Sequence, residues 1–156
     1  MAYRGDQLQE AVDFLGVVPQ DSPYFAFECP HVDRLVSLQV YLDDATLENG
    51  CLWMIPGSHT RGRLPCFEDQ GRLGRLYTDV ERALPGAQPV PIEAPAGTVI
   101  FFNGDVVHGS RRNRTALGRR AFVLTYQPAG HTQFRRPGAR PVRPAPHDLQ
   151  QGRNGF

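Results

Sequence analysis

Residues 101–126, which read FFNGDVVHGSRRNRTALGRRAFVLTY, place one histidine between two apolar runs and follow it with arginines. Imidazole is a common metal ligand, and two histidines with one carboxylate on one side of an iron(II) ion leave positions open for substrate and oxygen. A 2-oxo acid that chelates such an ion needs a partner for its far carboxylate, and a guanidinium can hold a carboxylate through two hydrogen bonds. His108 and Arg119 are therefore candidates for half of a metal and carboxylate site.

Two neighbouring arginines compete for the carboxylate-binding role. Residues 119–126 (RRAFVLTY) have the composition of a strand, and side chains alternate between the two faces of a strand. Only one of Arg119 and Arg120 can therefore share a cavity with His108. We expect it to be Arg119, because this residue begins the strand that follows the histidine.

The elements that must position these residues are mostly short strands. Other strands are predicted at residues 35–42, 51–55, 98–102 and 105–110, with turns at ENG, PGSH and PAG between them. In the first of these strands the apolar side chains share one face, and Ser37, Gln39 and Tyr41 share the other.

The rest of the chain contributes little regular structure. Residues 6–15 have apolar side chains at helical spacing and predict a short amphipathic helix. Residues 61–91 are irregular and polar, with one helical turn near residues 78–84. One helix followed by short strands predicts an all-β sandwich or barrel. We assign a single domain to residues 1–130 and a loosely ordered tail, rich in proline, arginine and glycine, to residues 131–156.

Composition limits the partners and the compartment. The 156 residues carry a net charge of +1, and all of the basic residues are arginine. No nucleic-acid-reading motif accompanies these arginines, so no nucleic-acid partner is expected. No apolar run approaches the length of a membrane span, and the N-terminus is polar. Cys29, Cys51 and Cys66 form no CxxC pair, which predicts free thiols and an intracellular, cytoplasmic location.

Three segments of the chain, YLDDATLENGCLWMIPGSHTRG, AGTVIFFNGDVVHGSRRN and RRAFVLTYQP, resemble the phytanoyl-CoA dioxygenase family of iron(II)/2-oxoglutarate oxygenases. The likeness runs from about Gln20 to Gln127, and the combination of ENG, PGSH, HGS, Asn113 and the arginine is more specific than any one piece. The resemblance implies a double-stranded β-helix, which is a jelly-roll or cupin-like barrel. It also implies iron(II) as cofactor and 2-oxoglutarate as co-substrate.

The resemblance assigns roles to individual residues. His108 matches the distal iron ligand, and Arg119 matches the residue that binds the 2-oxoglutarate carboxylate. Ser110 and Gln39 match positions that line the co-substrate pocket. Other residues have a simpler structural explanation: His59 and Asn113 in turns, and Trp53, Phe101 and Phe102 in the core.

The other two iron ligands of the family come as His-x-Asp before the strand at residues 35–42. Here QDSPYFAFE matches the residues after that histidine, so Asp21 matches the carboxylate ligand. Pro19, which has no side-chain donor atom, stands at the histidine position. A second possibility is PHVDR, in which His31 and Asp33 form a literal His-x-Asp closer to the strand. Spacing favours Asp21.

Only Val17 and Val18 separate the predicted helix from PQD, whereas two early strands lie between the matching segments of the family. The resemblance therefore implies a truncated or internally deleted barrel, whose exposed strand edges an oligomer or a partner chain would cover. Two functions stay open. One is a dioxygenase that hydroxylates or oxidises a small organic molecule, and the other is a non-catalytic relative that acts as a binding or partner subunit. We expect weak iron(II) binding if Asp21 and His108 act alone, and tight binding if His31 joins them.

Overall fold

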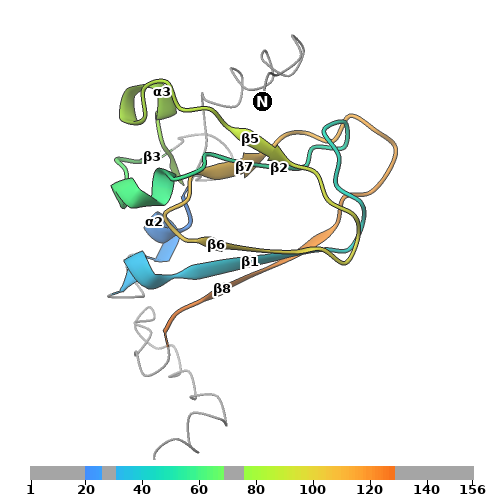
Figure 1. Ribbon diagram of the computed structural model, residues 1–156, viewed down its shortest axis with the longest axis horizontal. Helices are drawn as coiled ribbons and strands as arrows, with labels where there is room; N and C mark the ends of the chain where they lie inside the picture. Colours follow the sequence, from blue (N-terminus) through green and yellow to red (C-terminus); the bar gives the residue numbers. More distant parts are fainter. Residues whose placement is uncertain (1–19, 26–30, 69–75, 129–156) are drawn as a thin grey trace, which may run out of the picture.

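Two antiparallel three-stranded sheets face each other in the computed structural model, which describes residues 20–25, 31–68 and 76–128 (Figure 1). One sheet has the strand order β6-β1-β8 and the other has the order β5-β2-β7. Their strands are β1 (Val36–Tyr41), β2 (Leu52–Met54), β5 (Val90–Ile92), β6 (Val99–Asn103), β7 (His108–Ser110) and β8 (Ala121–Tyr126). This arrangement confirms the predicted all-β jelly-roll class.

Short elements connect the two layers. The helices are α2 (Ser22–Phe25) and α3 (Val80–Ala83), with 3-10 turns at Val32–Arg34 and Ser58–Arg61 and a small two-stranded sheet made of β3 (Phe67–Glu68) and β4 (Leu76–Tyr77). None of the helices in the described part of the chain is long and apolar enough to cross a membrane. The helix predicted at residues 6–15 and the tail at residues 131–156 lie outside the described residues.

Strand β1 is the centre of its sheet and pairs in antiparallel register with both neighbours. Leu38 lies opposite Phe101 of β6 and Leu124 of β8, and Ser37 lies opposite Thr125 of β8. The polar face of β1 points inward: Ser37 and Gln39 are buried, whereas Val36 is exposed. The sequence predicted these two faces correctly but did not indicate that the polar one is inside.

The apolar core lies between the two sheets and against the loops at their ends. Its buried members include Tyr41, Cys51, Leu52, Trp53, Ile55, Phe102 and Val107. Trp53 and Phe102 therefore occupy the core as expected. The expectation for Phe101 is wrong: this side chain is 67% exposed, because alternation along β6 turns it away from its buried neighbour.

The ENG sequence closes the connection between β1 and β2. Asn49 accepts a hydrogen bond from the Thr46 backbone N–H at 2.8 Å and donates one to the Asp44 carbonyl at 2.7 Å. Gly50 follows with a φ of +83°, and a Cβ at this position would collide with the Arg111 carbonyl. The turn therefore brings the start of β2 against the chain that leaves β7, and only glycine fits there.

Two boundaries differ from the sequence-based prediction. The region at residues 61–91, expected to be irregular, supplies the edge strand β5 as well as β3 and β4. Pro91 lies inside β5 and weakens its strand signal, and an edge position is where a proline is tolerated. Strand β8 begins at Ala121, so Arg119 and Arg120 precede the strand instead of opening it.

Candidate active site

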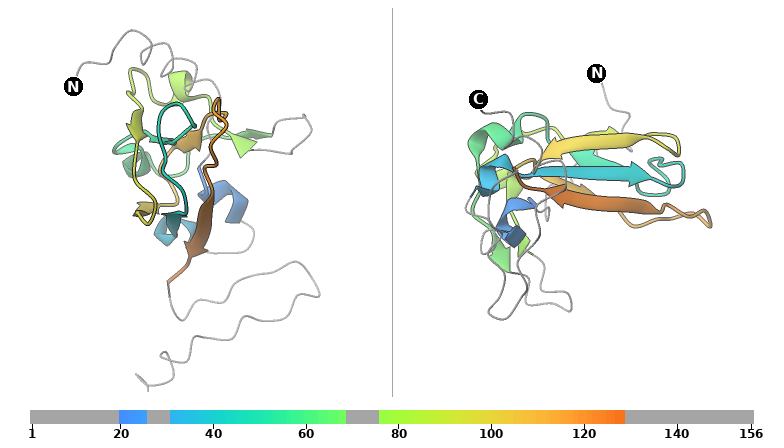
Figure 2. Two further views of the ribbon diagram at one scale, coloured as in Figure 1. Left: turned by 90° about the vertical axis from the view of Figure 1, so that its right-hand side faces the viewer. Right: turned by 90° about the horizontal axis from the view of Figure 1, so that it is seen from below.

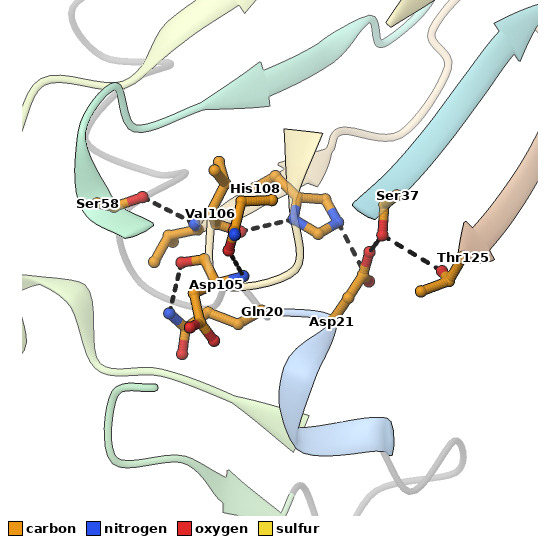
Figure 3. A network of polar contacts seen from close by, with 10 residues as sticks. Gln20, Asp21, Ser37, Ser58, Asp105, Val106, His108 and Thr125 are labelled. Atoms are coloured by element: carbon orange, nitrogen blue, oxygen red, sulfur yellow. Dashed lines mark hydrogen bonds and ion pairs between the residues drawn. The ribbon is translucent and has the colours of Figure 1, made fainter. Parts of the chain in front are cut away.

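Asp21 and His108 lie side by side, although they come from distant segments of the chain (Figure 3). Asp21 immediately precedes α2, and His108 is the first residue of β7. The imidazole Nε2 of His108 is 3.5 Å from the carboxylate Oδ1 of Asp21. The two side chains are 12% and 21% exposed, so the pair is shielded by the protein but still reachable from solvent.

The other ring nitrogen of His108 determines what faces Asp21. Nδ1 lies 2.9 Å from the carbonyl oxygen of Val106, which can only accept, so Nδ1 carries the hydrogen. In the neutral ring, Nε2 then presents a lone pair to a carboxylate oxygen. Two acceptors placed in this way repel each other unless a proton or a metal cation lies between them. The pair can therefore be an ion pair that shares a proton, or it can offer one nitrogen donor and one oxygen donor to a metal ion.

Asp21 is fixed from two sides. Its backbone N–H donates to the Gly104 carbonyl at 2.9 Å, at the end of β6. The Ser37 hydroxyl of β1 donates to carboxylate Oδ2, and Thr125 of β8 lies 3.3 Å from the same hydroxyl (Figure 3). These contacts occupy Oδ2 and leave Oδ1 directed at His108.

Gln20, the residue before Asp21, fastens this part of the chain to two loops. It is 1% exposed, and its side-chain amide donates to the carbonyls of Asp105 at 2.6 Å and Gly62 at 3.0 Å. Its oxygen accepts from the Leu64 backbone N–H at 2.8 Å. No role was predicted for Gln20 from the sequence, because one glutamine in a polar stretch forms no pattern.

Arg119 and Arg120 have different partners, although both precede β8 and strand alternation is therefore not the reason. Arg119 donates from Nε to the Asn49 carbonyl at 3.1 Å and from Nη1 to the Ser110 hydroxyl at 3.5 Å. Arg120, whose side chain is 76% exposed, instead forms an ion pair of 2.8 Å with Asp43 at the surface. Asp43 has its pKa lowered to about 2 by this arginine. A guanidinium carries five N–H donors, so Arg119 retains donors for a ligand carboxylate.

Gln39 and Tyr41 lie on the inward face of β1, near Arg119. Gln39 is 7% exposed, and its Nε2 is buried without a hydrogen-bond partner. Tyr41 is fully buried; burial raises the pKa of its phenol, while the hydrogen bond from Leu52 and the positive charge of Arg119 lower it. A buried amide donor without a partner is costly, and a ligand carboxylate would satisfy it. Tyr41 is a buried residue whose inward position the strand alternation alone could have indicated.

The remaining predicted residues lie in turns. His59 is exposed in the 3-10 turn Ser58–Arg61. Asn113 donates to the Leu117 carbonyl at 2.6 Å and accepts from Thr115, which holds the loop between β7 and β8. His31 precedes the turn Val32–Arg34. In this turn the exposed Asp33 accepts a hydrogen bond from the Asn103 side chain through its backbone carbonyl. Pro19 lies outside the described residues.

The donors fit iron(II) in kind, because an imidazole nitrogen and a carboxylate oxygen are ligands that this ion accepts. Their number is smaller than the two histidines and one carboxylate of the facial arrangement. Within residues 20–25, 31–68 and 76–128, no group of three or more His, Cys, Asp or Glu side chains could hold a metal ion. His31 and Asp33 thus do not join Asp21 and His108 in such a set.

Comparison with known sequences identifies the family of the chain. The family model for phytanoyl-CoA dioxygenase matches residues 16–121. Phytanoyl-CoA dioxygenase domain-containing protein 1 of Mus musculus is 34% identical over 119 residues, which are 74% of this chain and 40% of that protein. A methylphosphonate hydroxylase of Gimesia maris is 35% identical over 69% of this chain and 37% of its own length. The chain thus spans about 40% of the length of the curated relatives it matches.

Solved structures show the same fold. The epimerase SnoN from nogalamycin biosynthesis, in complex with Fe3+, alpha ketoglutarate and nogalamycin RO, superposes with a TM-score of 0.60 at 25% identity. The match covers 83% of this chain and 52% of SnoN. EvdO2 from Micromonospora carbonacea is 33% identical, with a TM-score of 0.51 over 70% of this chain and 44% of that one. The family match, the relatives and the fold together show that the chain belongs to the phytanoyl-CoA dioxygenase family.

Proposed function

We propose that the chain forms an iron(II)/2-oxoglutarate site for oxidation of a small organic molecule, most simply by hydroxylation. One observation supports this proposal: His108 Nε2 and the carboxylate of Asp21 lie 3.5 Å apart and converge on one point, where a metal cation can take the place of a shared proton. The relatives support the reaction class, since they include a methylphosphonate hydroxylase and an L-proline trans-4-hydroxylase. Both named substrates are small molecules.

His108 and Asp21 would hold the iron, and Arg119 would bind the far carboxylate of 2-oxoglutarate beside Ser110. The bound iron would supply the activation of oxygen, which protein side chains cannot perform. The chain itself contributes position and shielding. The Val106 carbonyl keeps the hydrogen of His108 on Nδ1, and Ser37 keeps one oxygen of Asp21 occupied.

A second candidate function is binding without turnover. The described residues supply two protein donors where the facial arrangement uses three, and Pro19 occupies the position that matches the missing histidine. Fewer protein ligands mean weaker metal binding and a less fixed orientation. Such a chain would bind a small anion such as 2-oxoglutarate, or act as the partner of another subunit.

Conversion of 2-oxoglutarate to succinate distinguishes the two candidates. The oxygenase proposal predicts succinate formation in air that requires added iron(II) and disappears in His108→Ala and Asp21→Ala. Arg120→Ala is the matched control, because the side chain of this arginine pairs with Asp43 at the surface. Binding of 2-oxoglutarate without succinate, under conditions in which the iron is bound, would favour the non-catalytic function.

A further inference from the structure

The outer face of the sheet β6-β1-β8 is apolar. We define this outer face as the side chains that point away from the sheet β5-β2-β7, and the strand registers group them in three rungs. The rungs are Asn103–Val36–Tyr126, Phe101–Leu38–Leu124 and Val99–Val40–Phe122. Eight of these nine side chains are aliphatic or aromatic, and none is charged. The view from below in Figure 2 looks directly onto these three strands.

Several of these side chains are exposed, and none of the described elements packs over them. Phe101 is 67% exposed, Phe122 is 56% exposed and Tyr126 is 55% exposed. Val36 and Val99, at opposite ends of the face, are 41% and 43% exposed. Large side chains gathered on one face of a sheet differ from single exposed residues, because a continuous apolar patch of several hundred Å² marks an interaction surface.

The polarity of β1 shows why the apolar face of this sheet is not its inner face. Its inward side chains Ser37, Gln39 and Tyr41 are buried, and Ser37 contacts Asp21 of the candidate active site. The sheet therefore cannot turn its apolar face inward without losing the contact between Ser37 and Asp21. A two-layer fold buries only the face between its layers, so this outer face needs a third layer.

We propose that the outer face is the contact between two copies of this chain, packed sheet against sheet about a two-fold axis. A two-fold contact brings the same patch of both copies together, and the absence of charge on this patch means that no like charges meet. Packed sheets lie about 10 Å apart, a spacing that the aromatic side chains of the patch can fill.

The size of the patch supports a second copy as its occupant. An aromatic side chain has a surface of about 200 Å². The five side chains that are about half exposed, together with their half-buried neighbours, therefore provide roughly 600 Å² of accessible surface per copy. A specific interface buries about 800 Å² per partner, with a lower limit near 600 Å². The contact would therefore be a dimer at the weak end of the specific range. It does not depend on the proposed function, because the candidate site lies on the other side of the sheet.

The test is the molar mass of the chain in solution, measured by light scattering after size-exclusion chromatography at several protein concentrations. Wild type is expected at twice the 17.4 kDa of the chain. Phe101→Glu, at the middle rung, is expected at the mass of one chain. The matched control is Leu117→Glu: Leu117 is 71% exposed in the loop before β8 and outside the outer face. This variant should keep the wild-type mass.

Two further measurements keep the test decisive. Circular dichroism and thermal melting verify that Phe101→Glu is folded, and Phe122→Arg tests the same face from the other edge strand. Loss of the dimer in both variants but not in Leu117→Glu supports the proposal. A wild-type protein that is monomeric at every concentration would overturn it, as would a dimer that survives both charged substitutions. A monomer that also fails to bind an apolar dye would show that the chain covers its own face.

Discussion

At the level of single residues, hydrogen bonds determine which atoms of Asp21 and His108 remain available for a ligand. The Val106 carbonyl takes one side of the imidazole, and the Ser37 hydroxyl takes one oxygen of the carboxylate. The remaining nitrogen and oxygen face each other at 3.5 Å. Hydrogen-bond partners of metal-binding side chains commonly act in this way, because they fix the tautomer of the histidine and the direction of each ligand atom.

Ser37 is predicted to matter for metal affinity even though it would not touch the metal. In Ser37→Ala, Asp21 loses the hydroxyl that holds Oδ2, so its carboxylate can rotate away from His108. We expect the affinity for iron(II) to fall roughly 10-fold to 100-fold, the range found for such supporting contacts. Anaerobic calorimetry measures the change, and Ser37→Thr, which keeps a hydroxyl, should recover most of the affinity. Equal losses in Ser37→Ala and Ser37→Thr would indicate a packing effect instead.

Arg119 and Arg120 make a matched pair of neighbours. Arg119→Ala should weaken 2-oxoglutarate binding about 10-fold to 100-fold, because a charge-assisted hydrogen bond contributes about 1.5–3 kcal/mol. Arg120→Ala should leave the affinity unchanged. The pKa of Asp43 is about 2, so its charge, and the Arg120 ion pair with it, is lost only as the pH falls toward that value. The pair therefore stays intact throughout a titration near neutral pH. If Arg120→Ala abolishes binding while Arg119→Ala does not, the side chains have the opposite orientation in solution.

At the level of the elements, the sequence predicts where most strands lie, but it does not predict how the strands pack against one another. Alternation and turn residues located β1, β2, β6, β7 and β8, because these signals are local. They could not show that Ser37 meets Asp21, since that contact depends on how distant segments pack. They also placed Phe101 in the core, because an apolar pair on a strand looks buried when only one face is considered. Strand β5 escaped detection because a proline interrupts its three residues.

The turn before β2 is predicted to tolerate no side chain at Gly50. Its φ of +83° disfavours every residue with a Cβ, and the added atom would meet the Arg111 carbonyl. Gly50→Ala should lower the free energy of unfolding by about 1–3 kcal/mol through backbone strain and the enforced shift. Urea denaturation monitored by Trp53 fluorescence measures this. Gly86→Ala is the control, since Gly86 also has a positive φ of +76° but nothing within 4 Å of its Cβ position. A similar loss in both variants would indicate that strain alone acts, without the collision.

At the scale of the whole molecule, one sheet serves two purposes. The inward face of β6-β1-β8 carries Ser37 and Thr125 toward the candidate site, and the outward face carries the apolar rungs. The site itself joins both sheets, because His108 belongs to β7 of the other one. Any change that separates the sheets is therefore expected to disturb metal binding and stability together.

The most direct test of the account is an anaerobic titration of the metal-free chain with iron(II) in the presence of 2-oxoglutarate, followed by visible absorption. Chelation of iron(II) by 2-oxoglutarate in the site should give a charge-transfer band, and the account predicts this band in wild type and its loss in both His108→Ala and Asp21→Ala. Binding should be weak, because only Asp21 and His108 among the described residues converge on the ion. Tight binding that His31→Ala destroys would restore the alternative ligand pair. A band that persists in His108→Ala would show that His108 and Asp21 do not hold the metal.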